Sequence, residues 1–157
     1  MKKPVLPLVQ PGTISRECSP TETDALVTLW LETYGKDKDG VNAKAYMWHV
    51  FSANRYPSLT GSDAMAEYKA QVAAEYVVLS NDRKTAFTTD LLPIASFLSD
   101  WYVFPKNLAW TMAFTHEDGW LGPYFARHPQ YPQLNEENLA RVRKHAEAAA
   151  ARQKGWR

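Results

Sequence analysis

The chain has 157 residues, of which 45% are hydrophobic and 22% charged, a composition typical of one globular domain with a sizeable core. Its 18 basic and 17 acidic residues give a formal net charge of +1, which excludes a global field that attracts nucleic acid or an anionic membrane. The single cysteine, Cys18, excludes an internal disulfide framework, and no apolar run reaches the roughly 18 residues of a membrane span, so we expect a cytoplasmic protein without membrane contact.

The beginning of the chain is rich in proline and shows no sustained hydrophobic period. We therefore expect an extended N-terminal arm over residues 1–18 and a single domain over residues 19–157. A helix should begin after Ser19, because Ser19 can cap it, Pro20 suits its first position and Glu22 completes a capping box. Apolar residues follow at helical spacing, which supports this helix.

The middle of the chain alternates between strand and helix patterns. Residues 46–51 predict a strand that is apolar on both faces, and residues 62–74 predict a helix. Residues 76–79 and 85–89 predict a hairpin. Residues 90–98 predict a short helix, which Pro93 confines to a first-turn start or a kink.

The clearest pattern of the chain lies in its second half. Residues 101–104 and 110–115 are close enough in sequence to predict an antiparallel hairpin. In the second strand Trp110, Met112 and Phe114 alternate with small residues, which is the pattern of a strand with one bulky face turned to the core. We expect this strand to run into a stiff loop.

These patterns predict an α+β domain with a mainly antiparallel sheet of four to five strands and helices packed on one side. The alternative is a mixed sheet sandwiched between helices. Residues 127–132 are too rich in proline for a helix, so the last helix should begin near Asn135. Acidic residues in its first turn and basic residues later suit the helix dipole.

Three potential metal ligands stand in a row at His116, Glu117 and Asp118. In an extended segment only the first and third can point the same way, so a metal site needs another ligand, for which His49 is the candidate. No spacing motif of a metal site occurs, and we expect neither a metal nor a cofactor. The sequence leaves open whether His49 and His116 lie close in space.

The motifs of nucleophilic catalysis and of phosphate binding are missing, since the chain has no Gly-x-Ser-x-Gly elbow and no glycine-rich loop with a lysine. The loop over residues 116–125 instead carries aromatic and polar side chains of the kind enriched in protein interfaces. The residues that we expect to bind a partner are His49, Arg55, His116, Glu117, Asp118, Trp120 and Tyr124.

Two short motifs resemble those of a family of small bacterial proteins of unknown function. They are Trp-His-x-Phe-Ser at residues 48–52 and Phe-Thr-His-Glu, followed by Gly-Pro-Tyr-Phe, within residues 114–125. The resemblance covers about residues 24–125 and brings no activity and no catalytic residues. Small bacterial α+β domains without catalytic motifs are often immunity-type or other binding proteins, an analogy of class, since fold does not imply function.

Three hypotheses follow from these observations. The first is a non-catalytic binding protein, immunity-like in that it occupies another protein's active surface, which engages a protein partner through the loop over residues 116–125. The alternative is a metal- or small-molecule-binding enzyme that uses His49, His116 and Glu117. The third and least favoured is nucleic-acid binding by the basic C-terminal helix, whose charges the helix dipole also explains. The sequence sets neither the partner nor the oligomeric state.

Overall fold

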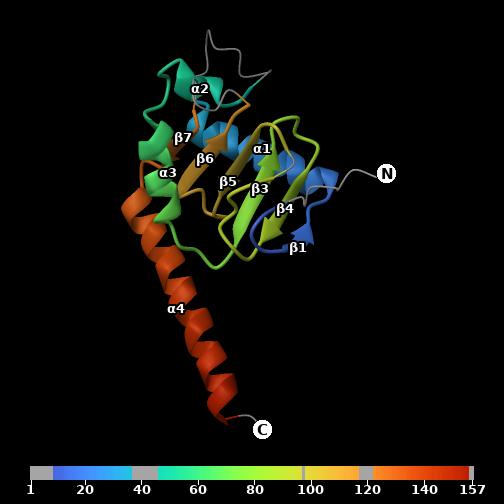
Figure 1. The fold of residues 1–157 in the computed structure, drawn as a ribbon, viewed down its shortest axis with the longest axis vertical. Coiled ribbons are helices and arrows are strands. Elements are labelled where there is room, and N and C mark those ends of the chain that lie inside the picture. The colour runs from blue at the N-terminus through green and yellow to red at the C-terminus, as the bar shows by residue number, and fades with distance from the viewer. Residues whose placement is uncertain (1–8, 37–45, 97, 117–121, 156–157) are drawn as a thin grey trace, which may run out of the picture.

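The structure, a computed structural model, describes residues 9–36, 46–96, 98–116 and 122–155. Its strands are β1 (Ile14–Glu17), β2 (Leu59–Thr60), β3 (Tyr76–Ser80), β4 (Ala86–Thr89), β5 (Trp101–Phe104), β6 (Trp110–Phe114) and β7 (Tyr124–Arg127). Its helices are α1 (Pro20–Tyr34), α2 (His49–Ser52), α3 (Gly61–Lys69) and α4 (Tyr131–Gly155). The strands form one sheet in the order β1-β4-β3-β5-β6-β7-β2, and every neighbouring pair is antiparallel (Figure 1).

The predicted α+β class with an antiparallel sheet is confirmed, but the sheet has seven strands and not four to five. Strands β3, β4, β5 and β6 lie where the sequence pattern places them, and β5 pairs with β6 as expected. The missed strands are short and lie at or next to the sheet edges. Strand β1 lies in the proline-rich segment, β2 has two residues, and β7 follows directly on the Gly122-Pro123 turn.

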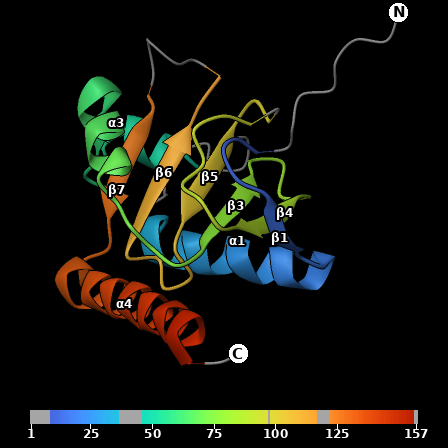
Figure 2. The same ribbon diagram turned by 60° about the horizontal axis from the view of Figure 1, so that its bottom comes forward.

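The prediction of helices on one side of the sheet is wrong, because helices cover both faces (Figure 2). Strand β5 shows this most clearly: Tyr102 and Phe104 pack in the cluster that contains α1 and α2, while Trp101 and Val103 pack in the cluster that contains α3. A strand whose two faces are both covered reads as a continuous apolar run, which is the pattern of β5.

The strand predicted over residues 46–51 is also wrong, because residues 49–52 form the single-turn helix α2. Met47, Trp48, Val50 and Phe51 are all buried. The steps between these residues, of one, two and one positions, place them on one face of a helix. A short apolar run of this kind does not distinguish a strand from a buried helical turn in the sequence.

Residues 90–98, for which a short helix is predicted, form no helix in their described part. The backbone N–H groups of Ile94 and Ala95 instead donate to the carbonyl of Gln10 at 2.6 and 3.1 Å. The Tyr68 hydroxyl donates to the carbonyl of Pro93. These contacts satisfy backbone groups that a helix would have satisfied internally.

Helix α1 begins with the predicted capping box. The Ser19 hydroxyl accepts from the Glu22 N–H at 3.1 Å, and the Glu22 carboxylate accepts from the Ser19 N–H at 3.0 Å. Two donors that the first turn leaves unsatisfied are therefore bonded reciprocally.

We expect Ser19→Ala to lower the free energy of unfolding by about 1 kcal/mol, because the Glu22 N–H loses its acceptor. Urea unfolding followed by circular dichroism measures this loss. The matched control is Thr33→Ala, which removes an exposed hydroxyl that bonds within the same helix, to the Leu29 carbonyl, and should leave the midpoint nearly unchanged. Equal shifts for the two variants would contradict a role for the cap.

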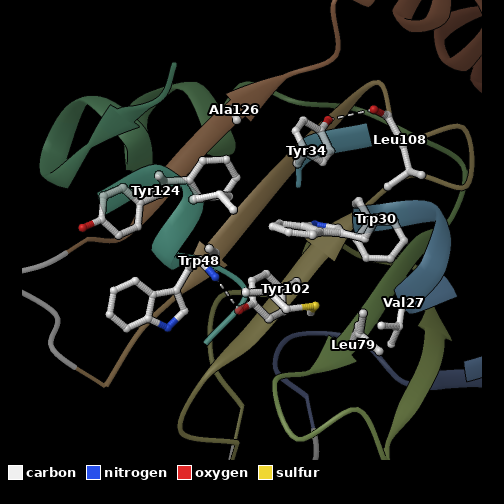
Figure 3. Close-up of a cluster of buried hydrophobic side chains, with 14 of the residues drawn as sticks. Val27, Trp30, Tyr34, Trp48, Leu79, Tyr102, Leu108, Tyr124 and Ala126 are labelled. Atoms are coloured by element: carbon white, nitrogen blue, oxygen red, sulfur yellow. Dashed lines mark hydrogen bonds between the residues drawn. The ribbon is translucent and has the colours of Figure 1, made fainter. Parts of the chain in front are cut away.

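Trp30 is the centre of the core on the α1 face of the sheet (Figure 3). It is fully buried, and its ring centroid lies 5.4, 5.7 and 5.1 Å from those of Tyr34, Phe51 and Tyr102. Its Nε1 donates to the Thr111 hydroxyl at 3.0 Å. The face of β6 that carries Thr111 and Ala113 is therefore buried, like its bulky face, because these small side chains leave room for the indole.

Helix α4 begins at Tyr131, four residues before the predicted start, and projects away from the sheet (Figure 1). Pro132 lies in its first turn, where a missing N–H costs nothing, so the proline-rich run does not delay the helix. Residues 143–153 are exposed along their whole length. None of the helices in the described ranges is both long enough and apolar enough to cross a membrane.

Candidate functional site

The register of the β5–β6 hairpin brings Asp100 and His116 together. Trp101, at the start of β5, pairs with Phe114, at the end of β6, so Asp100 comes opposite Thr115 and next to His116. The His116 Nδ1 lies 2.9 and 3.0 Å from the two carboxylate oxygens of Asp100. The His116 backbone N–H points to the same carboxylate at 3.4 Å.

Trp48 completes the bonding of this carboxylate, because its Nε1 donates to Asp100 Oδ2 at 2.8 Å. The Asp100 side chain is 6% exposed, whereas the His116 side chain is 38% exposed. A buried carboxylate is tolerated where donors satisfy it, and here it holds the imidazole in the tautomer that carries the proton on Nδ1. The buried Asp100 carboxylate therefore fixes the orientation of the half-exposed His116 side chain.

A second polar contact positions the Trp48 backbone. The Tyr102 hydroxyl accepts from the Trp48 N–H at 3.0 Å (Figure 3) and donates to the Asn81 side-chain carbonyl at 2.6 Å. That carbonyl also accepts from the Met47 N–H at 3.2 Å. Burial raises the pKa of Tyr102 well above its usual value, so the hydroxyl stays protonated and remains a donor. Strand β5 thus orders the start of α2.

Tyr46 connects the two histidines that the sequence analysis singles out. Its ring centroid lies 5.1 Å from that of His116 and 5.3 Å from that of His49. The His49 ring also packs edge-on against Trp48, at 4.6 Å between centroids. The structure therefore answers the open question of their proximity: His49 and His116 contact the same half-buried tyrosine. We call Tyr46, His49 and His116 the His116 surface.

The other residues expected to bind a partner are placed differently. Tyr124 belongs to β7 and is 3% exposed, with its ring stacked on Trp48 at 5.9 Å, so it is a core residue and not part of a loop. Arg55 follows α2 and is exposed, and its side chain forms no hydrogen bond or ion pair with the described residues. Glu117, Asp118 and Trp120 lie outside the described residues.

Gly122 turns the chain back into β7. Its φ of +95° is in the left-handed region, and an added Cβ would lie 3.0 Å from the Thr115 hydroxyl. Glycine is the residue that meets both requirements. This turn keeps the end of β6 and the start of β7 close together.

A family model, Domain of unknown function (DUF4275), matches residues 31–125, more than half of the chain. The chain belongs to this family. The match agrees with the predicted resemblance to a family of unknown function. Comparisons with curated proteins and with solved structures found no match.

The DUF4275 segment contains the whole site, from Tyr46 to His116, whereas β1, most of α1 and all of α4 lie outside it. Sequence reasoning found the two histidines of the site and missed Asp100, Trp48 and Tyr46. Asp100 had a usable signal: it directly precedes four bulky apolar residues of a predicted hairpin whose other strand ends next to His116. Trp48 had only its place in the Trp-His-x-Phe-Ser motif, and Tyr46 had none, because the strand predicted over residues 46–51 gave neither a role in a site.

Beside Asp100 the DUF4275 domain has a small pocket of about 170 Å³. Its walls are formed by Tyr46, Ser80, Asn81, Asp82, Leu98, Ser99 and Asp100. Within the described part of the chain, no three histidine, cysteine or acidic side chains converge as metal ligands. What the geometry offers is an oriented imidazole beside aromatic rings, which suits hydrogen bonding to a partner or proton transfer.

Proposed function

We propose that this chain is a non-catalytic binding protein. It engages a protein partner through the His116 surface and through the residues that follow His116 in sequence, up to residue 125. The observation that supports this most is Asp100, a buried carboxylate that accepts from both Trp48 and His116. Its effect is to hold an exposed side chain in one orientation.

Such an arrangement favours binding because its groups are ordered before the partner arrives. Association costs free energy for every flexible side chain that it immobilises, and a surface fixed in advance lowers that cost. Rigid rings with a polar edge, such as Tyr46 and the two histidines, are also suited to act as hot spots. We propose an immunity-like role, in which the chain covers the active surface of a partner enzyme.

The test is a pull-down from the native cell with purified tagged protein, followed by affinity measurement with the purified partner. We expect the wild type to retain a stoichiometric protein, and the Tyr46→Ala, His116→Ala double variant to bind it at least about 30-fold more weakly, since hot spots contribute about 2 kcal/mol or more. Near-ultraviolet circular dichroism shows that the variant is folded.

The matched control for this experiment is Arg143→Ala, which removes an exposed side chain on α4, away from the site. It should bind the partner like the wild type. A folded double variant with unchanged affinity, or a wild type that retains no stoichiometric protein, contradicts the proposal.

The second candidate function is a small-molecule-binding enzyme that uses His49, His116 and Glu117. The observation in its favour is the Asp100–His116 pair beside the pocket of about 170 Å³, because a carboxylate that orients an imidazole is a common arrangement for a general base. Native mass spectrometry and elemental analysis of the purified protein distinguish the two. A bound small molecule or metal that is lost in His116→Ala supports this candidate. Purified protein that carries no small molecule or metal, but does bind a protein partner, contradicts it.

A further inference from the structure

A second cavity of about 230 Å³ lies where α4 leaves the sheet, next to the end of β5 opposite to Asp100. Three parts of the chain form its walls: the segment before β3, the β5–β6 turn and one face of α4. The lining residues are Ala73, Ala74, Glu75, Pro105, Lys106, Asn138, Arg141 and His145.

The α4 wall presents polar groups at helical spacing. Asn138, Arg141 and His145 are separated by three and four residues, so they share one face of the helix. Asn138 is 5% exposed and donates to the Asn107 side chain at 3.3 Å, and Asn107 in turn donates to the Leu134 carbonyl at 2.9 Å. These bonds fix the helix to the β5–β6 turn and so fix the width of the cavity.

The side chains around the cavity carry more positive than negative charge, which favours an anionic ligand. Lys106 and Arg141 are cationic, His145 adds an imidazole, and Glu75 is the acid of the lining. Lys106 is paired with Glu75 at 3.3 Å. The Arg141 side chain lines the cavity and forms no hydrogen bond or ion pair with any residue in the described ranges.

We propose that this cavity binds a small phosphate-bearing anion, with Arg141 and Lys106 as charged donors and His145 as a further donor. A guanidinium presents a planar fork of donors that matches phosphate oxygens, and an ammonium acts as a second point charge. Drug-sized ligands occupy about 300–1,000 Å³, so this smaller cavity is of a size that suits phosphate or a small phosphorylated molecule.

The first experiment follows the melting temperature of the full chain in inorganic phosphate, with sodium chloride adjusted to keep the ionic strength constant. We expect a rise that becomes logarithmic in phosphate concentration above the dissociation constant, because a ligand that binds only the folded state stabilises it by RT ln(1 + c/Kd) at a free ligand concentration c. Glycerol phosphate is the second probe. A lower dissociation constant for glycerol phosphate identifies a phosphorylated molecule as the ligand class, and a lower one for inorganic phosphate identifies the free ion.

Variants of equal charge make the test specific. Arg141→Ala should weaken phosphate binding by about tenfold or more, the size of a lost charge-assisted hydrogen bond. Arg143→Ala removes the same charge two residues away, from a side chain that pairs with Glu136 at 3.5 Å and does not line the cavity, and should change little. Glu75→Gln removes the competing carboxylate and should strengthen binding.

Three results would overturn the proposal: no rise in melting temperature with either probe, equal losses in Arg141→Ala and Arg143→Ala, or weaker binding in Glu75→Gln. Equal losses would mean that phosphate responds to the diffuse charge of the helix and not to the cavity. Because these residues lie away from the His116 surface, the outcome is independent of the proposed protein partner.

Discussion

Trp30→Ala is expected to lower the free energy of unfolding by about 3–5 kcal/mol, a large fraction of the stability of a domain of this size. The indole is fully buried against Tyr34, Phe51 and Tyr102, and α1 and β6 are connected through its bond to Thr111. Truncation removes apolar contacts and leaves a cavity that the surrounding rings are too rigid to fill. Urea unfolding, followed by tryptophan fluorescence and circular dichroism together, measures the change.

Leu29→Ala is the matched control for this substitution. Leu29 is the neighbouring residue of the same helix but is 46% exposed, so its truncation should cost less than about 1 kcal/mol. Trp30→Phe separates packing from hydrogen bonding: it keeps a ring but leaves the buried Thr111 hydroxyl without its donor, and an intermediate loss is expected. A Trp30→Ala variant as stable as Leu29→Ala would mean that α1 is not held by this contact.

The elements that sequence reasoning predicted well are those with local causes. The capping box at Ser19 and Glu22 involves residues three apart, so it is visible in the sequence and is confirmed. The same holds for β5 and β6, which are joined by a short turn. By contrast, β2 has two residues and exists because β7 lies beside it, a relation that no local pattern reveals.

The site was only half predictable for a related reason. His49 and His116 are candidates by residue type alone, and the structure places both against Tyr46. What turns His116 into an oriented group is the Asp100 carboxylate, and this depends on the register of a hairpin. A shift of one residue would turn Asp100 to the other face, so the decisive contact is a tertiary one.

Strand β5 links the two sites of this chain. Asp100 precedes it and belongs to the His116 surface, while Pro105 and Lys106 follow it and line the cavity beside α4. Every residue of β5 is buried, and both of its neighbours, β3 and β6, are paired strands. The groups at its two ends are therefore carried by a fully buried central strand, which suits side chains that need fixed positions.

Asp100→Ala is expected to lower the free energy of unfolding by about 2–4 kcal/mol, although it removes a polar side chain. The Trp48 indole N–H and the His116 Nδ1 both lose their acceptor, and Trp48 is 1% exposed, so water cannot easily replace it. Asp24→Ala, which removes an exposed carboxylate from α1, is the matched control and should shift stability by less than about 0.5 kcal/mol.

Asp100→Asn then separates folding from binding. The amide oxygen still accepts from the Trp48 indole N–H, so most of the stability should remain. The amide lacks the negative charge and the second acceptor oxygen that hold His116. A folded Asp100→Asn variant should therefore bind the partner more weakly, and adding His116→Ala to it should cost little further affinity, because the two residues act as one unit. Full additivity of the two losses would show that Asp100 stabilises the domain without positioning His116, and the proposed binding surface would lose the observation that supports it most.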